Sequence, residues 1–159
     1  MSKIIFLDID GVLNDGQTDE RAPSGCIGID YPKVNLLKHI IDCTGAQVVL
    51  SSSWKEEFLD GELTTEDGMY LVEQLAQVFV ELEDITVPGK ASAYRGSEIR
   101  NWLDRHPDVD RWVVIDDDVF CDFEACGIFS HFVKTDYSYG LTWSLCDQAI
   151  SILNEGVCV

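Results

Sequence analysis

Short apolar runs and helical stripes of apolar positions alternate along the whole chain. A run of four to eight apolar residues is typical of a buried strand, whereas apolar positions three and four apart indicate one face of a helix. Glycine, proline and polar residues separate these segments and favour loops. The runs that predict strands are residues 3–7, 46–50, 84–87, 111–115 and 128–133. The stripes that predict helices are residues 32–45, 69–82, 99–106 and 142–156.

Local signals define several ends of these segments. Pro32 suits a first helical position, Gly45 suits the stop of the same helix, and Thr142 suits a cap. The serines at 51–53 can cap a further helix that begins near Trp54. Strands that alternate with helices argue for an open, mainly parallel five-stranded sheet with helices on both faces. We therefore expect one α/β domain over residues 1–159, with a short flap at residues 11–31 and no large cap.

Polar side chains follow three of the predicted strands at the point where each strand ends. In open α/β sheets, sites lie at the carboxyl ends of the strands, so these side chains are expected to converge. Several carboxylates in one place need a neutralising cation, and an all-oxygen site prefers Mg²⁺. These side chains are Asp8 and Asp10 after the first strand, Ser51 after the second, and Asp116 and Asp117 after the fourth.

The spacing of Asp8 and Asp10 suits two different chemical roles. Gly11 lets the chain turn directly after the pair. The first carboxylate can then face a metal ion and a phosphorus atom as a nucleophile, while the second swings back as general acid and base. Each carboxylate and Ser51 also has a simpler explanation, as a turn residue or a helix cap.

These segments resemble motifs of the haloacid-dehalogenase (HAD) phosphatases. Residues 6–14 (FLDIDGVLN) resemble the first motif, hhhDxDGhhx, residues 48–51 (VVLS) are similar to the second, and residues 113–117 (VVIDD) resemble the fourth. The resemblance implies a Rossmann-like fold, an aspartyl-phosphate on Asp8, Mg²⁺ as cofactor and phosphatase activity. It places the metal ligands among Asp8, Asp10, Asp116 and Asp117, with Asp116 and Asp117 as alternatives. A cytoplasmic location is expected because the apolar stretch at residues 4–7 is too short for a signal peptide.

The third motif supplies a cation for the phosphate, and two residues are candidates. Arg95 begins the segment RGSEIRNWL, which resembles a pattern of the HAD group associated with RNA repair proteins; Lys90 lies just before it. Ser52-Ser53-Trp54 and the Thr135-Asp136…Gly140-Leu141-Thr142 segment also recur in that group. The resemblance favours Arg95, and the phosphate-binding candidates are Ser51, Ser52, Arg95 and Lys90.

Charge changes the expected range of substrates. The chain carries 29 acidic and 11 basic residues, a net charge of −18, and such a field repels polyanions. We therefore expect no binding of an extended nucleic-acid backbone, but a nucleotide, a nucleic-acid end phosphate or another small phosphoester. The longest apolar runs are too short for a membrane span, so no membrane association is expected, and an oligomer is possible. A non-catalytic metal- or phosphate-binding regulatory module on the same fold is the alternative.

Overall fold

The structure is a computed structural model and describes residues 2–58, 65–87 and 94–157. Its strands are β1 (Ser2–Leu7), β2 (Gln47–Leu50), β3 (Leu82–Ile85), β4 (Val109–Asp116) and β5 (Phe132–Lys134). Its α-helices are α1 (Tyr31–Thr44), α2 (Glu66–Ala76), α3 (Arg95–Asp104) and α4 (Trp143–Glu155). Two 3₁₀ helices, η1 (Ser53–Phe58) and η2 (Phe129–His131), complete the elements.

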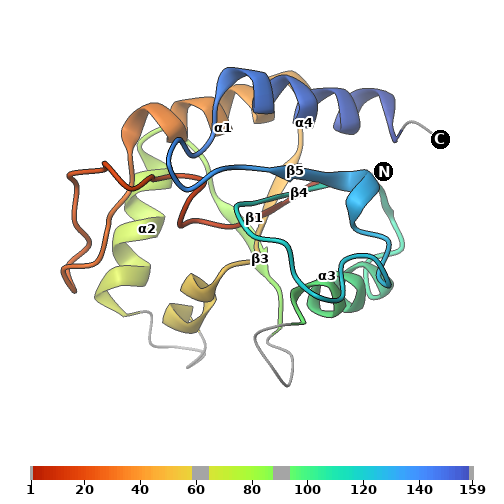
Figure 1. Cartoon of the computed structure of the whole chain (residues 1–159), viewed down its shortest axis with the longest axis horizontal. Coiled ribbons are helices and arrows are strands. Elements are labelled where there is room, and N and C mark those ends of the chain that lie inside the picture. Colours follow the sequence, from red (N-terminus) through yellow and green to blue (C-terminus); the bar gives the residue numbers. More distant parts are fainter. Residues whose placement is uncertain (1, 59–64, 88–93, 158–159) are drawn as a thin grey trace.

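All strand pairs in the sheet are parallel, and the strand order is β3-β2-β1-β4-β5. Figure 1 shows α1 and α4 along one side of the sheet and α3 on the other side. The predicted α/β sheet with helices on both faces is therefore confirmed. None of the described helices is long and apolar enough to cross a membrane.

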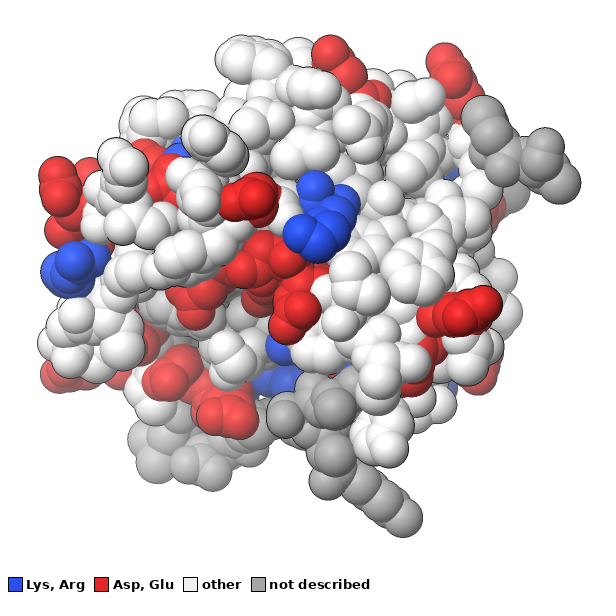
Figure 2. Space-filling view, in the orientation of Figure 1, with Lys and Arg blue, Asp and Glu red and all other residues white. Residues whose placement is uncertain are grey.

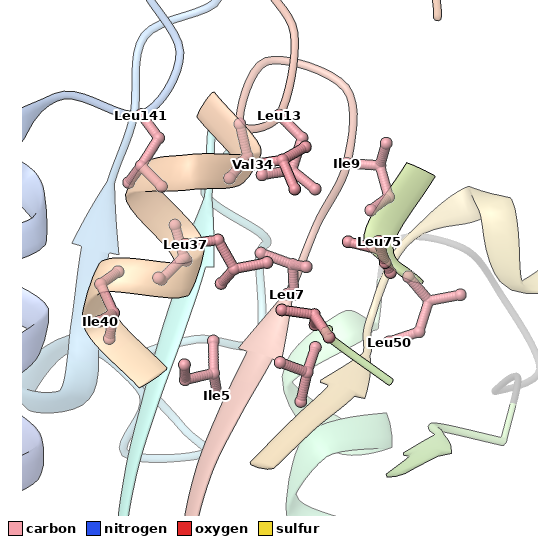
Figure 3. Close-up of a cluster of buried hydrophobic side chains, with 14 of the residues drawn as sticks. Ile5, Leu7, Ile9, Leu13, Val34, Leu37, Ile40, Leu50, Leu75 and Leu141 are labelled. Carbon is pink, nitrogen blue, oxygen red and sulfur yellow. The ribbon is translucent and has the colours of Figure 1, made fainter. Parts of the chain in front are cut away.

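Strand alternation divides the core into two layers. Ile5 and Leu7 of β1 pack into a cluster with residues of α1, α2 and α4, including Leu37 and Leu75 (Figure 3). Ile4 and Phe6 belong to a second cluster that includes Ile99 and Trp102 of α3. The rings of Phe6 and Trp102 meet edge to face, with centroids 5.4 Å apart. Even-numbered residues of β1 therefore face α3, which decides where Asp8 points.

The predicted cap and stop residues act as expected. Gly45 ends α1 with φ +72° and donates its backbone N–H to Ile41 O. The Thr142 hydroxyl accepts from the backbone N–H of Leu145 at the start of α4. Helix α1 begins one residue before Pro32, which fits the preference of proline for the first turn.

Several predicted segments differ from the structure. The strand expected at residues 84–87 lies at Leu82–Ile85, and the helix expected over residues 99–106 spans Arg95–Asp104. The helix expected near Trp54 is the 3₁₀ helix η1, and residues 129–131 form η2, so β5 begins only at Phe132. The helix expected over residues 69–82 starts at Glu66 and ends at Ala76. It ends there because Phe79 adopts a left-handed backbone conformation (φ +61°) and Val80 N–H bonds back to Leu75 O. The apolar stripe continues past this turn, so periodicity alone predicts too long a helix.

Candidate active site

Four neighbouring strands bring one side chain each to the same level of the carboxyl edge. Leu7 pairs with Leu50 on one side and with Ile115 on the other, so the next residues, Ser51, Asp8 and Asp116, are neighbours. Asp116 pairs in turn with Lys134. Asp8 and Asp116 continue the face of the sheet that packs against α3, because both carboxylates reach Arg95 of that helix. We call Ser51, Asp8, Asp116 and Lys134 the edge row.

Three carboxylates of this edge form a compact cluster. One carboxylate oxygen from each of Asp8, Asp116 and Asp117 lies within 4.8 Å of the other two. Asp116 is 1% exposed and Asp8 is 6% exposed. Burial and the nearby Asp116 carboxylate raise the pKa of Asp8 well above its ordinary value, against the opposing effect of Arg95. The same two causes raise the pKa of Asp117. Uncompensated negative charge is therefore concentrated at this point.

Gly11 permits the close turn that brings Asp117 to the cluster. Its φ is +78°, and a Cβ atom at this position would lie 2.3 Å from Oδ2 of Asp117. The Thr135 hydroxyl donates to Gly11 O at 2.6 Å and so fixes the turn from the loop after β5. A side chain at position 11 would therefore displace a member of the carboxylate cluster.

Arg95 supplies the positive charge at this cluster. Its Nη1 lies 2.8 Å from Oδ2 of Asp116 and 3.6 Å from Oδ1 of Asp8. Its guanidinium also stacks over the Phe120 ring, 4.4 Å from the centroid. Lys90, the other candidate cation, lies outside the described residues. The structure thus brings Arg95 to the candidate nucleophile.

Two buried polar atoms beside Asp8 lack a partner. Among the described side chains, Ser51 Oγ and Arg95 Nε are buried and make no hydrogen bond. The Ser52 hydroxyl, in contrast, hydrogen-bonds to Asp8 and accepts from the backbone N–H of Trp54 at 3.3 Å. Ser52 rather than Ser51 therefore performs the local capping that the sequence suggested for this serine run. An unpaired buried donor is costly, so two of them beside Asp8 mark a place for an anion.

Both oxygens of Asp10 are held by hydrogen bonds. Asn14 Nδ2 donates to Oδ1 at 2.9 Å, and the indole Nε1 of Trp54 donates to Oδ2 at 3.1 Å. Asn14 is fixed in turn, because it also donates to Gly28 O and accepts from Gly11 N–H. The Asp10 carboxylate is thus fixed by Asn14 and Trp54 and is not part of the three-carboxylate cluster.

Sequence reasoning missed two side chains at this edge. For Trp54, the sequence does not distinguish a residue whose indole N–H donates to Asp10 from an ordinary core tryptophan. Lys134 is exposed, its Nζ donates to Thr135 O at 3.3 Å, and within the described residues it makes no ion pair. Strand alternation from Phe132 would have placed it in the edge row. Figure 2 shows acidic side chains gathered at the middle of one face of the molecule, with basic side chains beside them.

A family model described as "HAD domain in Swiss Army Knife RNA repair proteins" matches residues 4–145. The match covers β2 to β5 in full, β1 from Ile4 onward, and all four members of the edge row. No curated protein matches the chain.

Proposed function

The chain belongs to the family of HAD domains in Swiss Army Knife RNA repair proteins, and from this premise we propose that it is a Mg²⁺-dependent phosphomonoester hydrolase. Asp8 is the nucleophile, and Asp10 is the general acid and base. Ser51, Ser52 and Arg95 bind the phosphate, with Lys90 as the alternative cation.

The unpaired donors beside Asp8 carry this proposal. Ser51 Oγ and Arg95 Nε are buried without an acceptor, and they flank a carboxylate whose position suits attack on phosphorus. A phosphate group offers several acceptor oxygens for these donors, and a guanidinium binds phosphate through more than one N–H. A carboxylate that served only as a turn residue would not require unpaired donors beside it. The same pair of donors therefore supports the assignment of Asp8 as nucleophile.

The donor set fits Mg²⁺. Asp8, Asp116 and Asp117 offer oxygen ligands alone, within 4.8 Å of one another, and these residues would hold the ion. The Asp10 side chain, which bonds to Asn14 and Trp54, is the least suited of the four sequence candidates. When bound, Mg²⁺ supplies positive charge that offsets the charge on the phosphate oxygens.

The chain's own residues then account for both halves of the reaction. An Asp8 oxygen attacks phosphorus, the bond from phosphorus to the leaving oxygen breaks, and Asp10 gives its proton to that oxygen. The products are an alcohol and a phosphoryl group on Asp8. Water next attacks phosphorus while Asp10 takes its proton, and the bond from phosphorus to Asp8 breaks. Orthophosphate leaves, and both carboxyl groups return to their starting states.

The substrate we propose is a nucleotide, a nucleic-acid end phosphate or another small phosphoester in the cytoplasm. The flap at residues 11–30 contains only one isolated bridge, between Arg21 and Ile27, so it is too slight to enclose a substrate. An open site suits a phosphate at the end of a larger molecule. The net charge of −18 opposes binding along an extended nucleic-acid backbone.

An assay with an artificial phosphomonoester tests the proposal. We expect Mg²⁺-dependent release of orthophosphate by the wild type, and loss of that activity in Asp8→Asn. Asp118→Asn is the matched control, because this exposed carboxylate lies beside the cluster but is not part of it. Mass spectrometry of quenched enzyme should find the phosphoryl group on Asp8. A wild type that is inert towards artificial, nucleotide and oligonucleotide phosphates would favour the non-catalytic binding module.

A further inference from the structure

Helix α3 is capped by a carboxylate from a distant loop. The first N–H groups of a helix have no partner within the helix, and a side chain at its N-cap often satisfies them. Tyr94 occupies the N-cap of α3 and makes no such bond. Asp122, in the loop after β4, takes this role. Its Oδ1 accepts from Gly96 N–H at 3.0 Å, and its Oδ2 accepts from the backbone N–H and the hydroxyl of Ser97 at 2.7 and 2.9 Å.

Gly96 leaves the space that this cap requires. A Cβ atom at position 96 would lie 2.7 Å from Oδ1 and 3.0 Å from Cγ of Asp122. Real Cβ atoms essentially never come so close to a carboxylate oxygen, so any side chain here would push Asp122 away. The glycine that follows Arg95 is thus explained by contact with Asp122.

The same loop also contacts the side chain of Arg95. The Phe120 ring lies under the guanidinium, 4.4 Å from Cζ, while Asp122 holds the next two residues of the helix. Arg100, five residues after Arg95 on α3, donates to Cys126 O at 2.6 and 3.2 Å. The loop is therefore fixed to α3 at three points, and two of them bear on Arg95.

Helix α3 is also anchored from the opposite side of the site. Lys55 of η1 forms a buried ion pair with Glu98, three residues after Arg95. Because η1 directly follows Ser51 and Ser52, this pair joins the phosphate-binding serines to the helix that carries Arg95. Glu98 lies in the first turn of α3, so the ion pair and the Asp122 cap restrain the same turn, and Asp122 alone binds its first backbone N–H groups.

We propose that Asp122 is a positioning residue that sets the place of the Arg95 guanidinium over Asp8 and Asp116. This inference rests on the proposed role of Arg95 in binding phosphate. Asp122 itself accepts its bonds from α3 and needs no contact with substrate. A misplacement of about 1 Å can cost a factor of about 10² in rate. Loss of the cap should therefore reduce turnover without removing any group that contacts the phosphate.

A double-mutant cycle tests the proposal. We expect Asp122→Ala to lower kcat/KM about 10- to 100-fold and to weaken inhibition by orthophosphate, but to have no further effect in an Arg95→Ala background. Thr142→Ala is the control, since it removes a side-chain cap from α4 on the other face of the sheet. It should lower the melting temperature and leave turnover unchanged. Equal losses from Asp122→Ala in both backgrounds would overturn the proposal.

Gly96→Ala gives a second test, because turnover is expected to fall although helix propensity predicts no loss of stability. Alanine favours helix formation more than glycine, so local propensity predicts no loss of stability from this change. We expect turnover to fall nevertheless, because the new methyl group displaces the Asp122 carboxylate. In an Asp122→Ala background the same change should cost nothing further.

A readout independent of catalysis separates this inference from the proposed function. The NMR signal of the Arg95 Nε–H group, assigned by its absence in Arg95→Ala, should shift or broaden in Asp122→Ala and stay in place in Thr142→Ala. If the wild type has no phosphatase activity but the signal responds in this way, the proposed function fails and the positioning role stands. If the wild type is active and Asp122→Ala changes neither the signal nor turnover, the positioning role alone is refuted.

Discussion

Under the proposed function, replacement of Arg95 by alanine should remove the main cation that faces the transferred phosphate. The guanidinium is almost buried, with Nη1 2.8 Å from Asp116 and Nε unpaired, so it is preorganised for an anion over Asp8. Loss of one preorganised donor typically costs about 2.7–4 kcal/mol of transition-state stabilisation, or about 10²–10³ in kcat. A second effect acts in the same direction. Arg95 lowers the pKa of Asp8, so its removal leaves less of the nucleophile ionised.

The assay compares kcat/KM for an artificial phosphomonoester across three variants at saturating Mg²⁺. Arg95→Ala should lose at least about 10²-fold, whereas Arg95→Lys should lose about 10-fold, because it keeps the charge but not the forked geometry. Lys90→Ala should stay within about threefold of the wild type, because Arg95 remains to bind the phosphate. If Lys90→Ala loses most activity and Arg95→Ala little, the assignment of the third-motif cation to Arg95 is refuted.

The remaining predictions concern single side chains. Burial raises the pKa of Asp8, so ionised Asp8 destabilises the fold, and stability falls as pH rises from about 3.8 through the folded-state pKa. Asp8→Asn should therefore raise the melting temperature in EDTA at pH 8 and much less at pH 4; a lower value at pH 8 would contradict this. Trp54→Phe keeps a buried ring but removes the donor to Asp10, and should lower kcat about 10-fold without weakening orthophosphate binding. Lys134→Ala should raise KM a few-fold at low salt and less at high salt, because an exposed cation acts through a screened field; an equal effect at both would count against steering. Phe79→Gly should raise the free energy of unfolding by about 0.5–1 kcal/mol in urea titrations, because Phe79 is left-handed and 87% exposed, while Phe79→Ala should bring no such gain.

Much of the fold could be predicted because strand and helix patterns are local. Three of the five predicted strands overlap their observed counterparts closely, the third begins two residues earlier at Leu82, and the fifth is shifted to Phe132–Lys134. The errors lie where tertiary contacts override periodicity. Ile128 is apolar like a strand residue, yet its N–H bonds to Phe123 O in a turn, which delays β5. The left-handed Phe79 ends α2 in a position that glycine usually occupies, so no residue type signalled the end.

The residues of the candidate site also fall into those that could be predicted from the sequence and those that could not. Asp8, Ser51 and Asp116 could be predicted as neighbours because the carboxyl ends of parallel strands meet at one edge. Their roles still await the assays above. Trp54 and Asp122 could not be found, because each acts through a contact between segments far apart in the chain. Such contacts leave no periodic signal in a single sequence.

The sheet order has a consequence for how the protein reaches its native state. β1 lies at the centre of the sheet, and its partner β4 is more than a hundred residues away along the chain, as the pair Ile5 and Val113 shows. Chains dominated by such distant pairings fold slowly, because the entropy of closing a long loop is lost before the stabilising contacts form. Asp8 and Asp116 meet only when this pairing forms. The unfolded chain therefore lacks the proposed metal-binding arrangement, and the proposal predicts that Mg²⁺ slows unfolding far more than it accelerates folding.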